Sequence, residues 1–199
     1  CLKLVAARGR LMEQLPQKGV MAAVFADEPT VKRAIAAHAG QVAIAVINGP
    51  TNIVISGTAA AVEAIQNDLA QREIKSRPLD VAQASHSPIV DPMLDEFERI
   101  AATITYHEPR IAYLSGMSAQ WSPQINAHYW RQHQRQAVRF GDALQALLAQ
   151  GYTYLVEIGR TNTLLAIAQR NLENADVLPE MASSLRKNQD DWGQLLQTL

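Results

Sequence analysis

Residues 41–56 read QVAIAVINGPTNIVIS, and this stretch decides the fold. Two short runs of β-branched and apolar residues flank a turn that contains Asn, Gly, Pro and Thr. β-Branched residues favour strands, and turn residues between two such runs are typical of a hairpin. The stretch therefore predicts two adjacent antiparallel strands, at residues 41–48 and 53–56.

The pattern continues on both sides of this pair. An apolar run of strand length precedes a helical pattern that stops at Gly40, and a second helical pattern leads into a fourth apolar run. The block 19–81 therefore has the order β-α-β-β-α-β, which is the ferredoxin-like pattern. The expected strands span 19–25, 41–48, 53–56 and 74–81, and the expected helices span 27–39 and 58–71.

Outside this block, helical and strand-like segments alternate, which predicts an α/β layer. The first helix, at 2–13, has no preceding N-cap residue, so the chain reads as a fragment that opens inside a helix. We expect one large α/β subdomain from residues 1–18 and 82–188, with the ferredoxin-like block inserted into it. Further helices are expected at 92–104, 127–134, 140–150, 161–171 and from 190, and strands at 111–114, 154–158 (buried) and 177–178.

Composition excludes several classes of protein. The chain has 199 residues, a net charge of −1 and 48% hydrophobic residues, so it can form a packed core but has no broad basic field for nucleic acid or anionic lipid. No uninterrupted apolar run is long enough to predict a membrane span. The single cysteine, Cys1, allows no internal disulfide, which fits a reducing cytoplasm. The histidine spacing gives no support to a metal site.

One histidine differs from the others by its context. No Gly-x-Ser-x-Gly nucleophile motif and no glycine-rich phosphate-binding motif occurs in the chain. His86 follows a predicted strand and precedes a predicted helix, in the segment QASHSP at 83–88. Loops after strands often carry chemistry, and a histidine there can accept a proton near neutral pH. The residues alone leave open a second interpretation, in which His86 is a polar turn residue.

A series of short motifs runs along nearly the whole chain: RGRLM (8–12), MAAV (21–24), NGP (48–50), VISG (54–57), SHSP (85–88), DPML (91–94), YW (129–130), VRF (138–140), EIG (157–159), SLR (184–186) and DDW (190–192). In sequence and in order, these motifs resemble the malonyl-type acyltransferase domains of modular polyketide synthases. Together they are far more specific than any one of them.

This resemblance implies both a fold and a reaction. The large subdomain would be α/β-hydrolase-like but incomplete, and residues 189–199 would begin the linker after the acyltransferase domain. The serine of the family's nucleophile motif is absent from the chain, so a preceding N-terminal segment would supply it. The reaction would move a malonyl-type extender unit from coenzyme A to an acyl-serine. The acyl group would then pass to the phosphopantetheine thiol of an acyl carrier protein, with no tightly bound cofactor.

The resemblance also implies roles for individual residues. His86 would be the catalytic base, and Arg8 would bind the free carboxylate of the extender unit, although an ordinary surface arginine is the competing interpretation. The backbone carbonyl of His133 would orient the ring of His86. Asn48 would line the substrate cleft, or would only serve its turn.

Substrate choice in this family correlates with the residues just before the base. Here they are Gln83, Ala84 and Ser85, which match neither the His-Ala-Phe-His pattern of malonyl nor the Tyr-Ala-Ser-His pattern of methylmalonyl enzymes. Gln83 and Ser85 are therefore the candidate specificity residues. Ser85 is smaller than Phe and leaves room for an α-substituent, which favours methylmalonyl or another branched unit. A difference of one methyl group is worth only about 1–3 kcal/mol.

The basic residues Arg131, Arg135 and Arg139 allow two interpretations, either a rim that attracts acidic partners or a solvated helix face with counter-charges. The expected partners are the acyl carrier protein and neighbouring synthase domains such as the ketosynthase. Two other functions remain open: a truncated, non-catalytic acyltransferase module that docks a carrier protein, and an unrelated ferredoxin-like regulatory domain. The regulatory domain leaves residues 82–199 unexplained.

Overall fold

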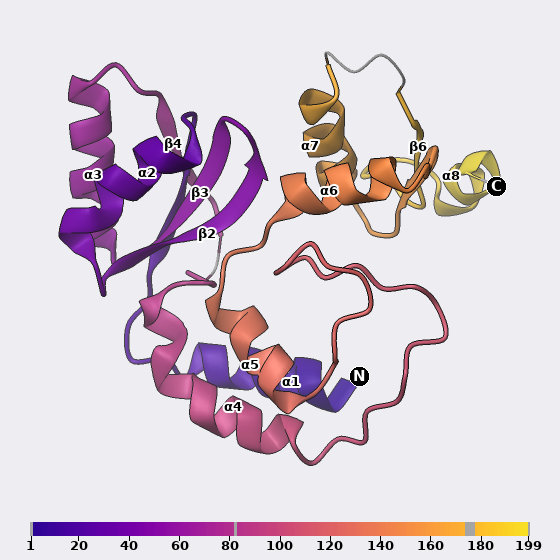
Figure 1. The fold of residues 1–199 in the computed structure, drawn as a ribbon, viewed down its shortest axis with the longest axis horizontal. Coiled ribbons are helices and arrows are strands. Elements are labelled where there is room, and N and C mark those ends of the chain that lie inside the picture. The colour runs from indigo at the N-terminus through magenta and orange to yellow at the C-terminus, as the bar shows by residue number, and fades with distance from the viewer. Residues whose placement is uncertain (1, 82, 174–177, 199) are drawn as a thin grey trace. The chain divides into compact units, whose positions relative to one another are not determined.

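The structure is a computed structural model that describes residues 2–81, 83–173 and 178–198. It contains both helices and strands, and it divides into two compact units, Cys1–Phe140 and Gly141–Leu199 (Figure 1). The units are considered separately below. Among the described residues, no helix combines the length and the hydropathy that a membrane span needs.

A four-stranded antiparallel sheet forms the centre of the small block in the first unit. Its strands are β1 (Val20–Val24), β2 (Val42–Gly49), β3 (Asn52–Gly57) and β4 (Ser76–Leu79), in the spatial order β2-β3-β1-β4. Two helices connect them, α2 (Glu28–Ile35), which continues into the 3-10 turn η1 (Ala36–His38), and α3 (Ala59–Gln71). The order of elements along the chain is the β-α-β-β-α-β order that the sequence predicted.

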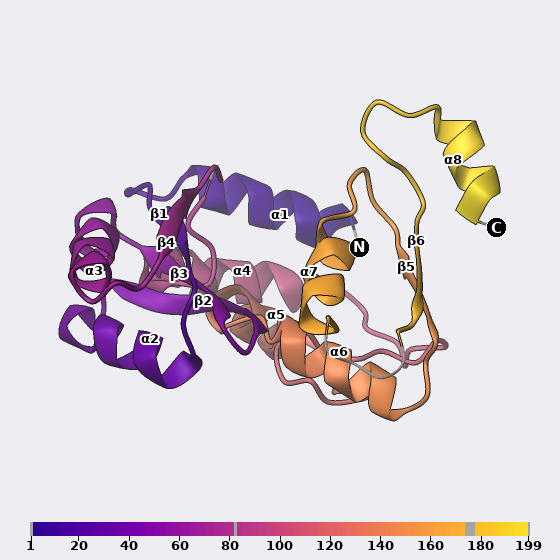
Figure 2. The same ribbon diagram turned by 90° about the horizontal axis from the view of Figure 1, so that it is seen from above.

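Both helices lie on one face of this sheet, as the two views in Figures 1 and 2 show. Their apolar residues, among them Val31, Val62 and Leu69, pack with strand residues such as Ile53 and Ile55 into one buried cluster. A second cluster, which includes Met21, Ala45 and Val54, covers the opposite side of the strands. Because both faces of the central strands are buried, β1 and β3 need continuous apolar sequences rather than alternating ones.

Local sequence explains where these helices begin. At the start of α2, Asp27 accepts a hydrogen bond from the backbone N–H of Thr30 at 2.8 Å. At the start of α3, the Thr58 hydroxyl accepts from the backbone N–H of Ala61 at 3.4 Å. Each cap satisfies one of the backbone donors that a helix N-terminus leaves unpaired.

Three helices form the second part of the first unit: α1 (Leu2–Glu13), α4 (Leu94–Ala101) and α5 (Ala127–Arg135). They share a core with residues of the 3-10 turn η2 (Pro88–Met93), and Phe97 is its most fully buried large side chain. The helix predicted at 92–104 is therefore shorter and begins as a 3-10 turn. Pro92 has no N–H for an α-helical hydrogen bond, which explains the shift.

The second unit contains α6 (Phe140–Ala149), α7 (Thr163–Asn171), α8 (Asp191–Thr198) and a two-stranded parallel sheet of β5 (Tyr154–Glu157) and β6 (Glu180–Ser183). The sequence did not predict β6. The prediction of a buried strand at 154–158 was wrong about burial, because Tyr154 and Val156 are 48% and 45% exposed. Within the described residues, this sheet has only two strands.

Two further strand predictions have different outcomes. The strand expected at 111–114 was wrong, since only Leu114 makes an isolated antiparallel bridge, to Trp121. Side-chain contacts hold this part of the chain instead. The hydroxyl of Tyr129 lies 3.0 Å from the hydroxyl of Tyr113 and 2.9 Å from the hydroxyl of buried Ser115. Of the strand expected at 177–178, Val177 lies outside the described residues and Leu178 is not in a strand.

Candidate functional site

His86 lies in the loop between β4 and η2, and its backbone has a left-handed φ of 58°. A residue with a Cβ atom in this conformation costs about 1–3 kcal/mol and persists only where its surroundings hold it. The surroundings here are hydrogen bonds. The backbone N–H of His86 donates to the carbonyl of Gln134 at 3.2 Å, and the buried hydroxyl of Ser87 donates to the carbonyl of Ala84 at 2.8 Å. The loop is therefore held on both sides of the histidine.

The ring of His86 is oriented by a backbone carbonyl. Its Nδ1 lies 2.8 Å from the carbonyl oxygen of Gln136. A carbonyl can only accept a hydrogen bond, so Nδ1 carries the proton in the neutral ring and Nε2 keeps a free lone pair. The sequence expectation placed the orienting carbonyl at His133, and this needs correction, because the hydrogen bond is to Gln136. The His133 carbonyl also interacts with the ring, but more weakly.

Electrostatics favour the neutral form of this histidine. Burial lowers the pKa of His86 below its ordinary value, the Gln136 carbonyl opposes this effect, and His133 and the charge on Arg8 lower it further. A neutral imidazole with a free Nε2 can accept a proton from an alcohol or a thiol. The side chain is half-buried, so a reacting group could still reach it.

Arg8 projects from α1, is exposed, and lines a cavity of about 320 Å³. His133 and Gln134, both on α5, line the same cavity. The structure thus brings together Arg8, which lies far from His86 in the sequence, and the helix whose backbone holds the His86 loop. The charge of Arg8 reaches both histidines, since it lowers the pKa of each.

The ring of His133 belongs to an aromatic cluster on α5. Its centroid lies 6.0 Å from that of His86, 6.0 Å from that of Tyr129 and 5.6 Å from that of Trp130. Its Nδ1 is fully buried and has no hydrogen-bond partner among the described residues. Burial and the charge of Arg8 lower the pKa of His133.

The remaining predicted site residues lie apart from this cavity. Gln83 and Ser85 are half-buried in the His86 loop, three residues and one residue before the histidine. Asn48 lies at the end of β2, and its amide donates to the side-chain oxygen of Asn52 at 3.5 Å, across the turn of the strand pair. This contact agrees with the simpler interpretation of Asn48 as a turn residue.

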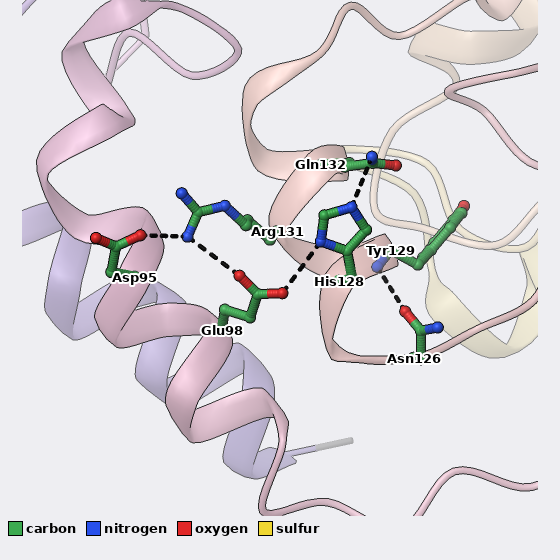
Figure 3. Close-up of polar contacts among 7 residues, drawn as sticks. All are labelled: Asp95, Glu98, Asn126, His128, Tyr129, Arg131 and Gln132. Atoms are coloured by element: carbon green, nitrogen blue, oxygen red, sulfur yellow. Dashed lines mark hydrogen bonds and ion pairs between the residues drawn. The ribbon is translucent and has the colours of Figure 1, made fainter.

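The arginines of α5 are paired with acidic residues of α4 and η2, and Figure 3 shows the contacts to α4. Arg131 contacts both Asp95 and Glu98, and Arg135 contacts Asp91 at 2.7 Å. Nδ1 of His128 lies 3.1 Å from the carboxylate of the same Glu98, and Figure 3 shows this contact too. Arg139 pairs separately with Glu28 at 3.5 Å. These contacts support the interpretation as a face with counter-charges rather than a free basic rim.

No sequence feature predicted that residues 136–139 hold the site. The Gln136 carbonyl holds the ring of His86, and Val138 pairs with the edge of β2 through hydrogen bonds to Ala45 and Ile47, at 2.8 and 2.7 Å. Every residue has a carbonyl, so no residue type could have identified this segment. Within the described residues, no group of three His, Cys, Asp or Glu side chains could hold a metal ion.

Known proteins resemble this chain over nearly its whole length. The family model described as the acyl transferase domain matches residues 1–199. The chain is 41% identical over 192 residues to the polyketide synthase GfsA of Streptomyces halstedii, covering 94% of this chain and 3% of that protein. It is 40% identical over 190 residues to the mycoketide-CoA synthase of Mycobacterium tuberculosis, covering 94% and 4%.

Solved structures extend the comparison to the fold. The acyltransferase domain from the second module of the salinomycin polyketide synthase superposes with a TM-score of 0.93 at 40% identity, over 98% of this chain and 46% of that one. The malonyl-CoA:acyl carrier protein transacylase of Xanthomonas oryzae superposes with a TM-score of 0.83 at 27% identity, over 98% and 62%. The chain thus spans about half the length of the first of these structures. It belongs to the acyl transferase domain family and is similar to the members that form part of polyketide synthases.

Proposed function

We propose that this chain is the base-bearing part of an acyltransferase that loads a malonyl-type extender unit, methylmalonyl or another branched unit being favoured, onto an acyl carrier protein. The observation that carries the proposal is the state of His86, whose Nδ1 is held by the Gln136 carbonyl while burial keeps the ring neutral. A second support is the position of Arg8, a permanent cation whose charge reaches the same ring.

The chemistry needs a serine, which in this proposal comes from a segment that precedes these residues in the complete domain. Nε2 of His86 takes the serine proton as the serine oxygen attacks the thioester carbonyl. The bond to sulfur then breaks, and the proton passes from His86 to the leaving thiolate of coenzyme A. An acyl-serine ester and free coenzyme A result.

The second half of the reaction repeats these steps in reverse order. His86 takes the proton from the phosphopantetheine thiol of the carrier protein, whose sulfur attacks the ester carbonyl. The serine oxygen leaves and regains its proton from His86. During both halves the guanidinium of Arg8 binds the free carboxylate of the extender unit, a pairing that can use two parallel hydrogen bonds.

Acyl-serine formation in the complete acyltransferase domain tests the proposal. We expect His86→Ala to lower the rate of acylation by malonyl-CoA or methylmalonyl-CoA by about 10²–10⁴-fold, because general base catalysis supplies that much. Mass spectrometry of the intact protein measures the acyl-serine directly. His128→Ala is the matched control, since His128 is exposed and pairs with Glu98 of α4, and it should acylate at the unaltered rate.

Two results would count against the proposal. Unchanged acylation of His86→Ala would remove the histidine from the reaction. A complete domain that accepts no acyl-coenzyme A thioester, yet still binds a carrier protein, would instead support the non-catalytic docking module.

A further inference from the structure

The cavity beside Arg8 has one apolar side and a few polar groups. Its apolar lining comes from α1, α4, α5 and the neighbouring loops: Leu4, Val5, Phe97, Ile104, Ile125 and Trp130. The charged or readily ionised side chains on it are Arg8, His107 and His133. A volume of about 320 Å³ exceeds what a carboxylate needs. The cavity can therefore take a charged group together with a hydrocarbon chain.

One ring nitrogen of His133 is not paired within the part of the chain that the structure describes. This nitrogen, Nδ1, is buried and has no hydrogen-bond partner there. A buried N–H without an acceptor costs more than a buried lone pair without a donor, so the proton of the neutral ring belongs on Nε2. Because His133 lines the cavity while its Nδ1 is buried, Nε2–H is the donor that remains available there.

The position of this donor is fixed before any ligand binds. The ring packs edge-on or tilted against Tyr129, Trp130 and His86, at centroid distances of 5.6 to 6.0 Å. Burial and the charge of Arg8 lower the pKa of His133 and keep its ring neutral. The ring therefore supplies a hydrogen-bond donor without placing a second positive charge beside Arg8. Side chains that are held by packing lose less entropy when they bind a ligand.

We propose that the His133 side chain is a second donor, beside Arg8, for the free carboxylate of a 2-alkylmalonyl thioester, and that the apolar wall of the cavity holds the alkyl substituent. The proposal rests on the proposed function and narrows its substrate class. A carboxylate accepts up to about four hydrogen bonds, so Arg8 alone does not saturate it. The alkyl group would lie against the wall that includes Ile104 and Ile125.

Three variants of the complete domain test the donor. His133→Leu fills the same space with an apolar side chain and removes the hydrogen-bond donor, whereas His133→Asn keeps an N–H donor. Arg8→Ala shows the effect of losing the arginine contact to the carboxylate. The measured quantity is kcat/KM for acyl-serine formation with methylmalonyl-CoA and with propionyl-CoA, which lacks the free carboxylate. We expect His133→Leu to lower the ratio of the two about tenfold or more, mainly through KM, as expected for a hydrogen bond to a charged group. His133→Asn should restore much of the ratio.

A fourth variant tests the apolar wall. Ile125→Trp fills the cavity and should reduce kcat/KM for butylmalonyl-CoA much more than for malonyl-CoA. An equal loss on both thioesters in His133→Leu, without recovery in His133→Asn, would overturn the carboxylate contact in favour of a purely structural role. An unaltered ratio would overturn it as well. These outcomes differ from failure of the proposed function, in which the unmodified domain would form no acyl-serine with any thioester.

Discussion

His86 combines a left-handed backbone with a ring that is held at one nitrogen and free at the other. The hydrogen bonds around Ala84, Ser87 and Gln134 offset the cost of the left-handed φ. Four other non-glycine residues, Glu73, Ala119, Ser122 and Asn188, have a left-handed φ as well, so this backbone conformation alone does not identify a site. The held ring of His86 is the feature that supports catalysis.

The lowered pKa of His86 predicts how the reaction depends on pH. Lowering the pKa keeps the base neutral to a lower pH, so kcat/KM for acyl-serine formation should stay level down to about pH 6.5, the ordinary value for histidine, and fall only below it. Acylation by methylmalonyl-CoA measured from pH 5 to 8 shows this limb. Arg8→Ala removes a positive charge that lowers the pKa of His86 and should move the limb to higher pH, whereas His128→Ala should leave it in place. A limb centred above pH 6.5 in the unmodified domain would contradict the prediction.

At the scale of elements, the small sheet meets the site through residues 136–139 and through the start of β1. Val138 pairs with the edge strand β2, two residues after the carbonyl that orients His86. On the other side, Gly19 lies so close to the His86 loop that an added Cβ would come within 2.2 Å of Ile89 and 2.5 Å of Ala84. The sheet and the loop therefore cannot shift independently by much.

Gly19→Ala should destabilise the domain and disturb the base together. The added methyl group must displace Ile89, Ala84 or the backbone of Gly57, and overpacking of this kind costs about 1–3 kcal/mol. Gly9→Ala is the control, because nothing lies within 4 Å of an added Cβ there and alanine is the better helix former, by about 0.5–1 kcal/mol. Urea unfolding gives both free energies. Equal stability of the two variants would show that the contact between sheet and loop is looser than described.

At the scale of the whole molecule, each compact unit leaves apolar side chains uncovered. In the first unit, Leu2 and Ile111 are 86% and 83% exposed, and in the second unit both outward positions of β5 are about half exposed. Parallel sheets are normally covered on both faces, and a sheet of two strands is marginal by itself. Such surfaces are typical of parts that pack against further protein.

This exposure predicts that the chain is less stable alone than in the complete domain. Residues 1–199 produced alone should bind more of a hydrophobic dye per mole, and should unfold at a lower temperature, than the same residues joined to the serine-bearing segment. Dye fluorescence and a thermal scan on both proteins make the comparison. Leu2→Lys together with Val156→Lys should lower dye binding of the isolated chain. Similar dye binding by both proteins would show that these faces stay uncovered in the complete domain.

Much of the fold could be predicted from the sequence because its signals are local. The turn at 48–52, the helix stop at Gly40 and the apolar runs around them predict the β-α-β-β-α-β order that the structure shows. The prediction was wrong where a segment depends on distant partners. Residues 111–114 contain strand-forming residues, yet they bond through side chains to Tyr129, and β6 forms only because β5 lies beside it.

The family and the β-α-β-β-α-β order of the small block could be predicted from the sequence alone, because motifs and hydrophobic periodicity depend on residue types. His86 and Arg8 as site residues stay predictions from the same motifs. The folded structure was needed to show which carbonyl holds the ring of His86, that the arginines of α5 are paired, and that Arg8 shares a cavity with His133. Backbone carbonyls are identical in every residue, and ion pairs and cavities join residues from separate elements. Such features exist only once the chain has folded.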